Sequence, residues 1–246
     1  MGSFSLGVLS TIDEPLLPYY LDSFIKNNIS DIYVICDEKN VSNKDKIIWH
    51  ERTLGFINHN NQKNIYNYNR KSLPFYFVSN HNSKQAINLY KSLKLECLFN
   101  AGTPRKISTK IINLMGIGVV NIHPGILPQY RGCSAVEWAI FNDEKIGNTA
   151  HFMDKGYDTG PIILSESYNF FKNIEYVKIR RHVYNKGCKL AGKVVSMIKK
   201  NKITKLSSSL VVQDEDIAKY YPPISEEKLK NIILKVSENR YKYQNK

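Results

Sequence analysis

The sequence predicts an α/β protein with a Rossmann-like, mostly parallel sheet, helices on both faces of that sheet, and a short C-terminal appendix. Short apolar runs typical of buried strands alternate along the chain with segments whose apolar residues recur at helical spacing. This alternation favours parallel strands joined by crossover helices. The chain has 246 residues, of which 42% are hydrophobic, and this is enough for a sizeable core.

The first half of the chain supplies most of the predicted sheet. The expected strands are apolar runs at residues 4–10, 31–37, 75–79, 96–99 and 118–122. The expected helices lie between them, at residues 16–27, 40–53, 83–93 and 108–114. In the first helix Pro15 suits the opening turn, and Leu17, Leu21 and Phe24 mark one face. Residues 54–72 are polar and rich in Asn, so we expect a loop or a weak helix there.

The second half completes the sheet and leads into the appendix. We expect a short helix at 135–141, strands at 148–153 and 161–167, and a long helix at 175–199. The main domain is placed at residues 1–200 and the appendix at 201–246. The appendix contains a candidate strand at 210–212, a helix break at 220–223 and a terminal helix at 226–237. Its apolar and aromatic residues predict a contact in a homodimer.

Charge and cysteine usage narrow the expected partners. The net charge is +13, but the lysines are dispersed, so we interpret the charge as a solvated surface and expect no nucleic-acid partner. The four cysteines are far apart and form no CxxC pair, which argues against a metal site and favours reduced thiols. No apolar run approaches the roughly 20 residues of a membrane helix, and the start does not resemble a signal peptide. We therefore expect a cytoplasmic protein without a membrane partner.

Two segments that follow strands combine the side chains that acyl transfer requires. Asn121 and His123 lie in NIHPGILPQYRG, residues 121–132, and Asp158 lies in GYDTGP, residues 156–161. An amide can donate to a developing oxyanion, an imidazole can move a proton, and a carboxylate can orient that imidazole. Each residue also has a purely structural interpretation, as a turn cap, a buried hydrogen-bonding group or an Asx-turn. Ligands of such sheets bind at the carboxyl ends of strands, where these segments lie.

The same two segments resemble the signature of the N10-formyltetrahydrofolate-dependent formyltransferases. The shared pattern is NxHPxxLPxYRG followed by GxDTGP; the resemblance is specific over about 99–164 and extends in architecture over about 4–190. It implies that Asn121, His123 and Asp158 are catalytic, and that an acceptor amine attacks the formyl carbon without a metal. Asn121 and His123 would then stabilise the oxyanion, while His123 and Asp158 would move protons.

The resemblance also implies binding residues on both sides of the catalytic set. The predicted cofactor-binding residues are Asn100, Gly102, Thr103, Pro104, Arg105, Ile107 and Asp154. The predicted substrate-binding residues are Pro124, Gly125, Arg131, His151, Tyr157 and Tyr221. The loop at 100–107 could instead be an ordinary turn, Arg131 could cap a carbonyl, and the tyrosines could be core or dimer contacts. The Leu127–Pro128 bond is a candidate cis peptide by the same resemblance.

The acceptor is predicted by exclusion among the known branches of that family. Asp13 and Glu14 stand where a glycinamide ribonucleotide enzyme is expected to have a phosphate-binding loop, and the appendix is too short for a tRNA-binding barrel. A nucleotide-sugar N-formyltransferase remains, acting on a substrate such as dTDP-4-amino-4,6-dideoxyglucose for surface polysaccharide, the O-antigen. The alternatives are another formyl-folate enzyme and a non-catalytic folate- or nucleic-acid-binding protein.

Overall fold

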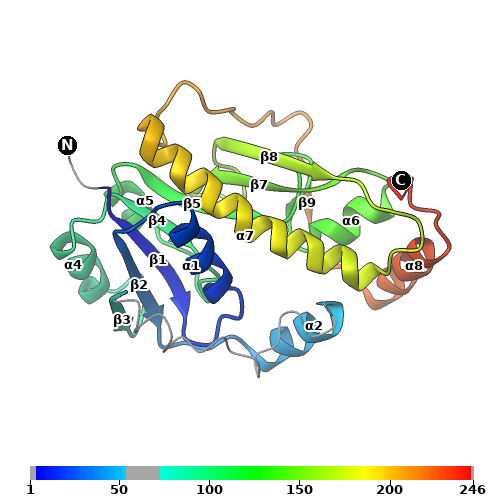
Figure 1. Cartoon of the computed structure of the whole chain (residues 1–246), viewed down its shortest axis with the longest axis horizontal. Coiled ribbons are helices and arrows are strands. Elements are labelled where there is room, and N and C mark those ends of the chain that lie inside the picture. The colour runs from blue at the N-terminus through cyan, green and yellow to red at the C-terminus, as the bar shows by residue number, and fades with distance from the viewer. Residues whose placement is uncertain (1–3, 54–72, 245–246) are drawn as a thin grey trace.

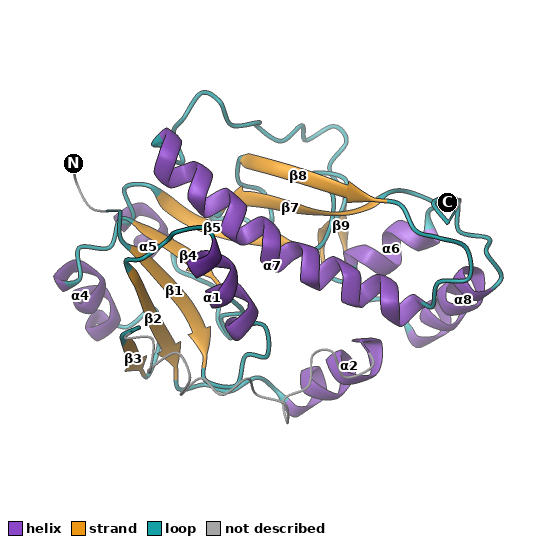
Figure 2. Ribbon diagram, in the orientation of Figure 1, coloured by secondary structure: helices purple, strands orange, loops and turns teal. Residues whose placement is uncertain are grey.

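A seven-stranded sheet with the strand order β3-β2-β1-β4-β5-β7-β8 forms the centre of the molecule (Figures 1 and 2). The structure is a computed structural model that describes residues 4–53 and 73–244; the predicted loop or weak helix at 54–72 lies outside the described residues. The strands are β1 Leu6–Thr11, β2 Ile32–Asp37, β3 Phe75–Val78, β4 Cys97–Asn100, β5 Gly118–His123, β7 Ile146–Phe152 and β8 Ile162–Tyr168.

Strands β1 to β5 are parallel, whereas β5–β7 and β7–β8 are antiparallel pairs. The predicted α/β class with a mostly parallel sheet is therefore confirmed. The helices are α1 Leu17–Lys26, α2 Asn43–Thr53, α4 Lys84–Ser92, α5 Thr109–Leu114, α6 Ala135–Phe141, α7 Tyr176–Asn201 and α8 Glu226–Ser237. Figure 1 shows α1 and α7 crossing one face of the sheet.

Two apolar cores lie on opposite faces of the sheet because side chains alternate along each strand. On β1, Leu6 and Val8 pack with residues of α1 and α7, whereas Leu9 packs with residues of α4 and α5. On β5, Val120 joins the first core and Val119 joins the second. The strands near the centre are thus covered on both sides, and the edge formed by their carboxyl ends is left for the site.

The chain after α7 packs against the rest of the molecule through a third core. Ile232 and Val236 of α8 and Tyr241 share this core with residues of α6 and α7. Within the predicted strand at 210–212, Val211 forms a single bridge to Ile162. A two-residue strand, β9 Tyr220–Tyr221, pairs in parallel with β6 Arg131–Gly132, directly after the segment that carries His123. The domain boundary at residue 200 stays a prediction.

The structure also bears on the predictions about the cysteines and about membrane-spanning helices. All four cysteines are free; Cys133 is exposed and the other three are buried. Over residues 4–53 and 73–244, no helix combines the length and the apolar character that crossing a membrane requires.

Candidate active site

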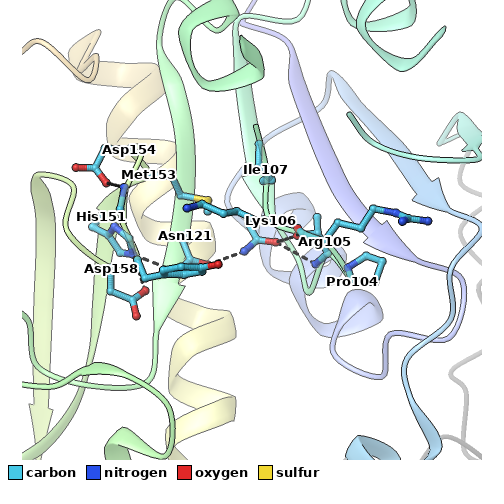
Figure 3. A pocket seen from close by; sticks show the side chains of 13 residues that line it. Pro104, Arg105, Lys106, Ile107, Asn121, His151, Met153, Asp154 and Asp158 are labelled. Atoms are coloured by element: carbon cyan, nitrogen blue, oxygen red, sulfur yellow. Dashed lines mark hydrogen bonds and ion pairs between the residues drawn. The ribbon is translucent and has the colours of Figure 1, made fainter. Parts of the chain in front are cut away.

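Strands β4, β5 and β7 bring the predicted catalytic and neighbouring residues to one edge of the sheet. Asn100 is the last residue of β4, and Asn121 and His123 belong to β5 itself. Asn121 thus lies within the strand predicted at 118–122, whereas Asn100 and His123 each extend a predicted strand by one residue. The antiparallel register sets His151 of β7 opposite Asn121. Figure 3 shows Asn121 between His151 and Asp158 on one side and the 104–107 segment on the other.

A row of hydrogen bonds joins the 100–107 loop to β7 through Asn121 of β5. The amide nitrogen of Asn100 donates to Oδ1 of Asn121 at 3.0 Å. The amide nitrogen of Asn121 lies 3.1 Å from Nε2 of His151, and Nδ1 of His151 lies 3.0 Å from the Phe152 carbonyl. Thr103 donates its backbone N–H to Oδ1 of Asn100, also at 3.0 Å. The side chain of Asn121 is thereby held from both sides.

His123 faces a carboxylate with one ring nitrogen and a carbonyl with the other. Its Nε2 is 2.6 Å from the Tyr130 carbonyl, and its Nδ1 is 3.4 Å from Oδ2 of Asp158. A carbonyl only accepts, so Nε2 carries a proton and Nδ1 is the nitrogen that can gain or lose one. The backbone N–H of Gly132 donates to the same carboxylate oxygen at 3.0 Å. This geometry suits a proton shared between His123 and Asp158.

The position of Asp158 is set by its backbone conformation and by hydrogen bonds to neighbouring backbone carbonyls. It adopts a left-handed conformation with φ of 57°, which Asp tolerates better than most residues. Gln213 donates its amide to the carbonyls of Asp158 and Gly160, at 2.8 Å and 2.7 Å. Gln213 lies in the appendix, and no feature of the sequence connects it with the site.

Burial keeps the second histidine neutral. His151 is 1% exposed, and this desolvation lowers its pKa to about 4, although the nearby Asp158 carboxylate raises it in part. The His151 Nε2 atom is 3.7 Å from Oδ1 of Asp158. A neutral imidazole with both nitrogens in contact with polar partners behaves as an interior hydrogen-bonding group in the resting site. The predicted substrate-binding role of His151 stays a prediction.

A pocket of about 360 Å³ opens beside Asn121, within the range of small-ligand sites. It is lined by Asn100, Thr103, Pro104, Arg105, Lys106, Ile107, Asn121, His151, Met153, Asp154, Gly156, Tyr157 and Asp158. The sequence did not single out Lys106, Met153 and Gly156 as site residues, although Lys106 lies in the predicted 100–107 loop, Gly156 opens the GYDTGP motif and Met153 precedes Asp154. The Asp154 carboxylate accepts from the Gly156 N–H and the Thr159 hydroxyl. These hydrogen bonds order the side of the pocket that residues 154–158 form.

Several side chains that line the pocket are tied to neighbours. Arg105 donates to the Asp37 carboxylate at 2.9 Å and to the Ser79 carbonyl at 3.3 Å, and Figure 3 shows it extended away from Asn121. Tyr157 is 59% exposed, and Nζ of Lys106 lies 4.3 Å from the centre of its ring. At the rim of the pocket a ligand would therefore meet backbone groups and the ring of Tyr157 more than unpaired charged side chains.

Other predicted binding residues lie outside this pocket lining. Gly102 has a φ of 79°, and a side chain there would collide with the carboxyl group of Glu14. Gly125 packs behind His123, and Pro124 follows the same strand. Arg131 is 7% exposed and bonds to Gln213 and Glu215 instead of facing the pocket.

Tyr221 lies in a second pocket, of about 780 Å³, which is also lined by Ile126, Gln129 and Tyr130 of the segment after β5. Its ring stacks on that of Tyr130, with 5.2 Å between ring centres. The cis peptide expected at Leu127–Pro128 is present.

In the loop after β1, the side chains of Asp13 and Glu14 fold back against the protein. Asp13 forms an ion pair with Lys46 at 2.6 Å. Glu14 is 4% exposed, and burial raises the pKa of its carboxyl group to about 8. No group of three or more His, Cys, Asp or Glu in the described part of the chain is arranged to hold a metal ion.

Comparisons with known proteins identify similar sequences. A family model described as formyl transferase matches residues 13–195. A methionyl-tRNA formyltransferase of Clostridium tetani is 28% identical over 157 residues, which cover 61% of this chain and 51% of that protein. The bifunctional polymyxin resistance protein ArnA of Wigglesworthia glossinidia brevipalpis is 29% identical over 157 residues, which cover 62% of this chain and 23% of that protein. The chain thus spans about half the length, or less, of these curated relatives.

Solved structures share the fold at lower sequence identity. A 4-N formyltransferase from Francisella tularensis superposes with a TM-score of 0.62 at 21% identity, covering 94% of this chain and 80% of its own. A glycinamide ribonucleotide transformylase from Symbiobacterium toebii gives 0.63 at 17%, covering 87% and 96%. An N-formyltransferase from Helicobacter canadensis, solved with folinic acid and dTDP-3-aminofucose, gives 0.56 at 18%, covering 89% and 70%. At these identities the likeness concerns the fold.

Proposed function

The chain belongs to the formyl transferase family, and from this membership and the site we propose that it transfers a formyl group from N10-formyltetrahydrofolate to the amine of a nucleotide-linked amino-dideoxy sugar. The observation that carries the proposal is the meeting of Asn121, His123 and Asp158 at one edge of the sheet. A pocket between the 100–107 loop and the 153–158 segment is lined by Asn121 and Asp158, and His123 contacts Asp158 from outside that lining.

Each catalytic side chain has a role that follows from its contacts. In the reaction the acceptor nitrogen bonds to the formyl carbon while the bond from that carbon to the folate nitrogen breaks. Asn121 uses one amide hydrogen on His151 and keeps the other for the developing oxyanion. His123 and Asp158 take the proton that the acceptor amine loses and return one to the leaving nitrogen. Protons therefore balance within the site.

The residues of the pocket fit a flat, polar heterocycle such as a pterin. The pocket lies between loop backbone at 103–107 on one side and Met153 and Asp154 on the other. Ile107 is 2% exposed and Met153 packs against the same core, so this part of the lining is apolar and firmly held. When bound there, the co-substrate supplies the formyl carbon. The binding roles of Asn100, Thr103, Pro104, Arg105 and Asp154 belong to this proposal.

The acceptor class is supported by the loop after β1. A phosphate cradle needs free backbone donors or cations at a strand-to-helix turn. Here Asp13 already holds Lys46, and Glu14 is buried with its carboxyl group over Gly102. That arrangement disfavours a ribonucleotide phosphate at this turn. The Helicobacter canadensis N-formyltransferase solved with dTDP-3-aminofucose shares this fold, as glycinamide ribonucleotide transformylases also do, so the fold is compatible with a sugar amine without selecting it.

A methionyl-tRNA acceptor is the second candidate, because relatives by sequence carry that name. A panel of acceptors separates the two. The protein is incubated with N10-formyltetrahydrofolate and either a dTDP-linked 4-amino sugar, glycinamide ribonucleotide, methionyl-tRNA or water alone. We expect tetrahydrofolate release, and a mass gain of about 28 Da on the acceptor from the added CO, with the nucleotide sugar. Turnover with methionyl-tRNA and none across a set of nucleotide amino sugars would replace the proposal.

We also propose that the protein is cytoplasmic and that it forms a homodimer. The chain after α7 would form the contact between the two subunits. Val211, Val212 and Tyr220 are 60%, 84% and 61% exposed, which is unusual for apolar side chains in one short segment. Light scattering at several concentrations gives the mass in solution. A mass near 28 kDa at every concentration, as expected for a single chain, would contradict the dimer.

A further inference from the structure

The hydrogen bonds that hold Asn121 all run in one direction. They pass from the Thr103 N–H to Asn100, from Asn100 to Asn121, from Asn121 to His151, and from His151 to the Phe152 carbonyl. The four donor-to-acceptor distances lie between 3.0 Å and 3.1 Å. Both ends are backbone groups, and a backbone N–H only donates while a carbonyl only accepts.

The fixed ends decide the orientation of every group between them. The Phe152 carbonyl requires the proton of a neutral His151 to sit on Nδ1, so Nε2 must accept. Asn121 must then present its NH₂ group to His151 and its oxygen to Asn100. Asn100 in turn presents its NH₂ group to Asn121 and its oxygen to Thr103. Reversing one amide alone would set two acceptors or two donors against each other.

We infer that Asn100 is a positioning residue, which acts through Asn121 and fixes the amide of Asn121 with its NH₂ group toward His151 and the pocket. This inference rests on the proposed formyl transfer, because it assigns the amide of Asn121 as the oxyanion donor. Asn100 is the first residue of the predicted cofactor-binding loop, so the loop that receives one reactant also sets the polarity of the catalytic amide.

The Asn100→Asp variant tests the polarity without changing the size of the side chain. One oxygen of the new carboxylate still accepts from Thr103, but the other faces Oδ1 of Asn121. Asn121 is then expected to turn over, which directs its oxygen toward Nε2 of His151. That oxygen needs a donor, so His151 gains a second proton. The charged groups around His151 are Asp158, His123 and Asp154, and the two carboxylates assist this protonation.

The measurement is the titration of His151 by ¹⁵N NMR, which needs no catalytic activity. In the wild type we expect a neutral ring with its proton on Nδ1 down to about pH 5, because burial lowers the pKa to about 4. In Asn100→Asp we expect His151 to titrate at least about two pH units higher. In Asn100→Ala, which removes the donor without adding an acceptor, His151 should titrate as in the wild type.

Activity provides a second readout. We expect Asn100→Asp to lower kcat by roughly 10²- to 10³-fold, the loss typical of removing one oxyanion donor. Asn100→Ala should lower kcat by much less. Because Asn100 also belongs to the proposed folate-binding loop, KM for the folate should change to a similar extent in both variants. Asn80→Asp is the matched control: it adds the same charge near the same sheet edge while keeping its acceptor role toward the Asn82 N–H.

Three results would overturn the inference. One is a wild-type His151 with its proton on Nε2, which can be read even if a variant fails to fold. The second is an unchanged His151 titration in Asn100→Asp together with a large loss of kcat, which would leave Asn100 with a binding role only and no role in orienting Asn121. The third is a normal kcat in that variant. If no acceptor is formylated by the wild type, the proposed function fails while the NMR test still decides the hydrogen-bond polarity.

Discussion

His123 keeps one ring proton on the Tyr130 carbonyl and turns its other nitrogen toward Asp158. The imidazole therefore has a fixed orientation and one nitrogen for proton transfer. His123 is 4% exposed, so water does not readily replace its partners. At the residue scale, backbone atoms thus decide which ring nitrogen of His123 donates and which accepts. A substitution of His123 should therefore affect proton transfer more than folding.

Replacing His123 by Asn should lower kcat by roughly 10²- to 10⁴-fold, because the group that moves the acceptor proton is lost. Tetrahydrofolate release measures this rate with the best acceptor found. His50→Asn on the exposed side of α2 serves as the control and should keep the wild-type rate. A His123→Asn enzyme within a few fold of wild type would show that the imidazole is not the proton carrier.

The neutral state of His151 makes stability depend on pH. Its pKa is about 4 in the folded protein and about 6.5 when unfolded. Because the folded pKa is the lower one, the unfolded chain binds more protons between these values, and stability falls as the pH falls from about 6.5 toward 4. We expect this group alone to cost about 2 kcal/mol between pH 7 and pH 5.

Urea unfolding of the wild type and of His151→Gln at both pH values isolates that contribution. The glutamine can accept from Asn121 and donate to Phe152 but does not titrate. The variant should therefore lose less stability than the wild type on going to pH 5. Other groups with shifted pKa values, such as Asp37 and Glu14, are present in both proteins and cancel in the comparison. Equal losses would mean that His151 is not held neutral.

At the scale of elements, the pairing of β5 with β7 builds the site. The register places His151 beside Asn121 and Thr149 beside His123. After β7 the chain turns through Asp158 and returns as β8, and a side chain on Gly160 would lie 1.9 Å from the Phe152 carbonyl. That carbonyl is the one that accepts from His151. Gly160, the second glycine of the GxDTGP motif, therefore leaves room for the Phe152 carbonyl, which ends the row of hydrogen bonds.

Gly160→Ala should consequently cost about 1–3 kcal/mol of stability, the usual range for forcing extra atoms into a packed site. It should also lower kcat, because Phe152 must move away from His151. Gly116→Ala is a matched control, since a side chain there meets nothing within 4 Å. Chemical unfolding and initial rates on both variants make the test. Equal stability and rates in the two would show that the close approach at Gly160 is readily relieved.

The sequence predicted these elements well and their pairing less well. Apolar periodicity placed the seven strands of the main sheet and the described helices within a few residues, because burial dictates that pattern. It did not indicate the two-residue strands β6 and β9, and the strand predicted at 210–212 is a single bridge. The periodicity also did not indicate that β5 and β7 run antiparallel in a register that unites Asn121 with His151. Nor did it connect Arg131 with Gln213 and Glu215, which lie more than 80 residues further along the chain. Such contacts depend on tertiary packing, which local patterns do not encode.

At the scale of the whole molecule, three cores hold one site. Two lie on opposite faces of the sheet. The third joins α6, α7 and α8 and includes Tyr130, whose carbonyl contacts His123. Strand β9 pairs with β6, so residues after α7 brace the segment whose Gly132 N–H supports Asp158. The predicted boundary at residue 200 therefore crosses a packed region of the described structure.

If the proposed nucleotide-linked sugar is the acceptor, the net charge of +13 should act on it through its phosphates. A positively charged protein attracts a nucleoside diphosphate over distances that salt screens, with a screening length of about 10 Å at 0.1 M. KM for a dTDP-linked amino sugar should therefore rise several-fold between 0.05 M and 0.5 M salt, in the manner of screened attraction, while kcat changes little. Inhibition by dTDP should weaken in parallel, whereas any inhibition by uncharged thymidine should not. A KM that is independent of salt would place the excess charge away from the acceptor and leave it as a solvated surface.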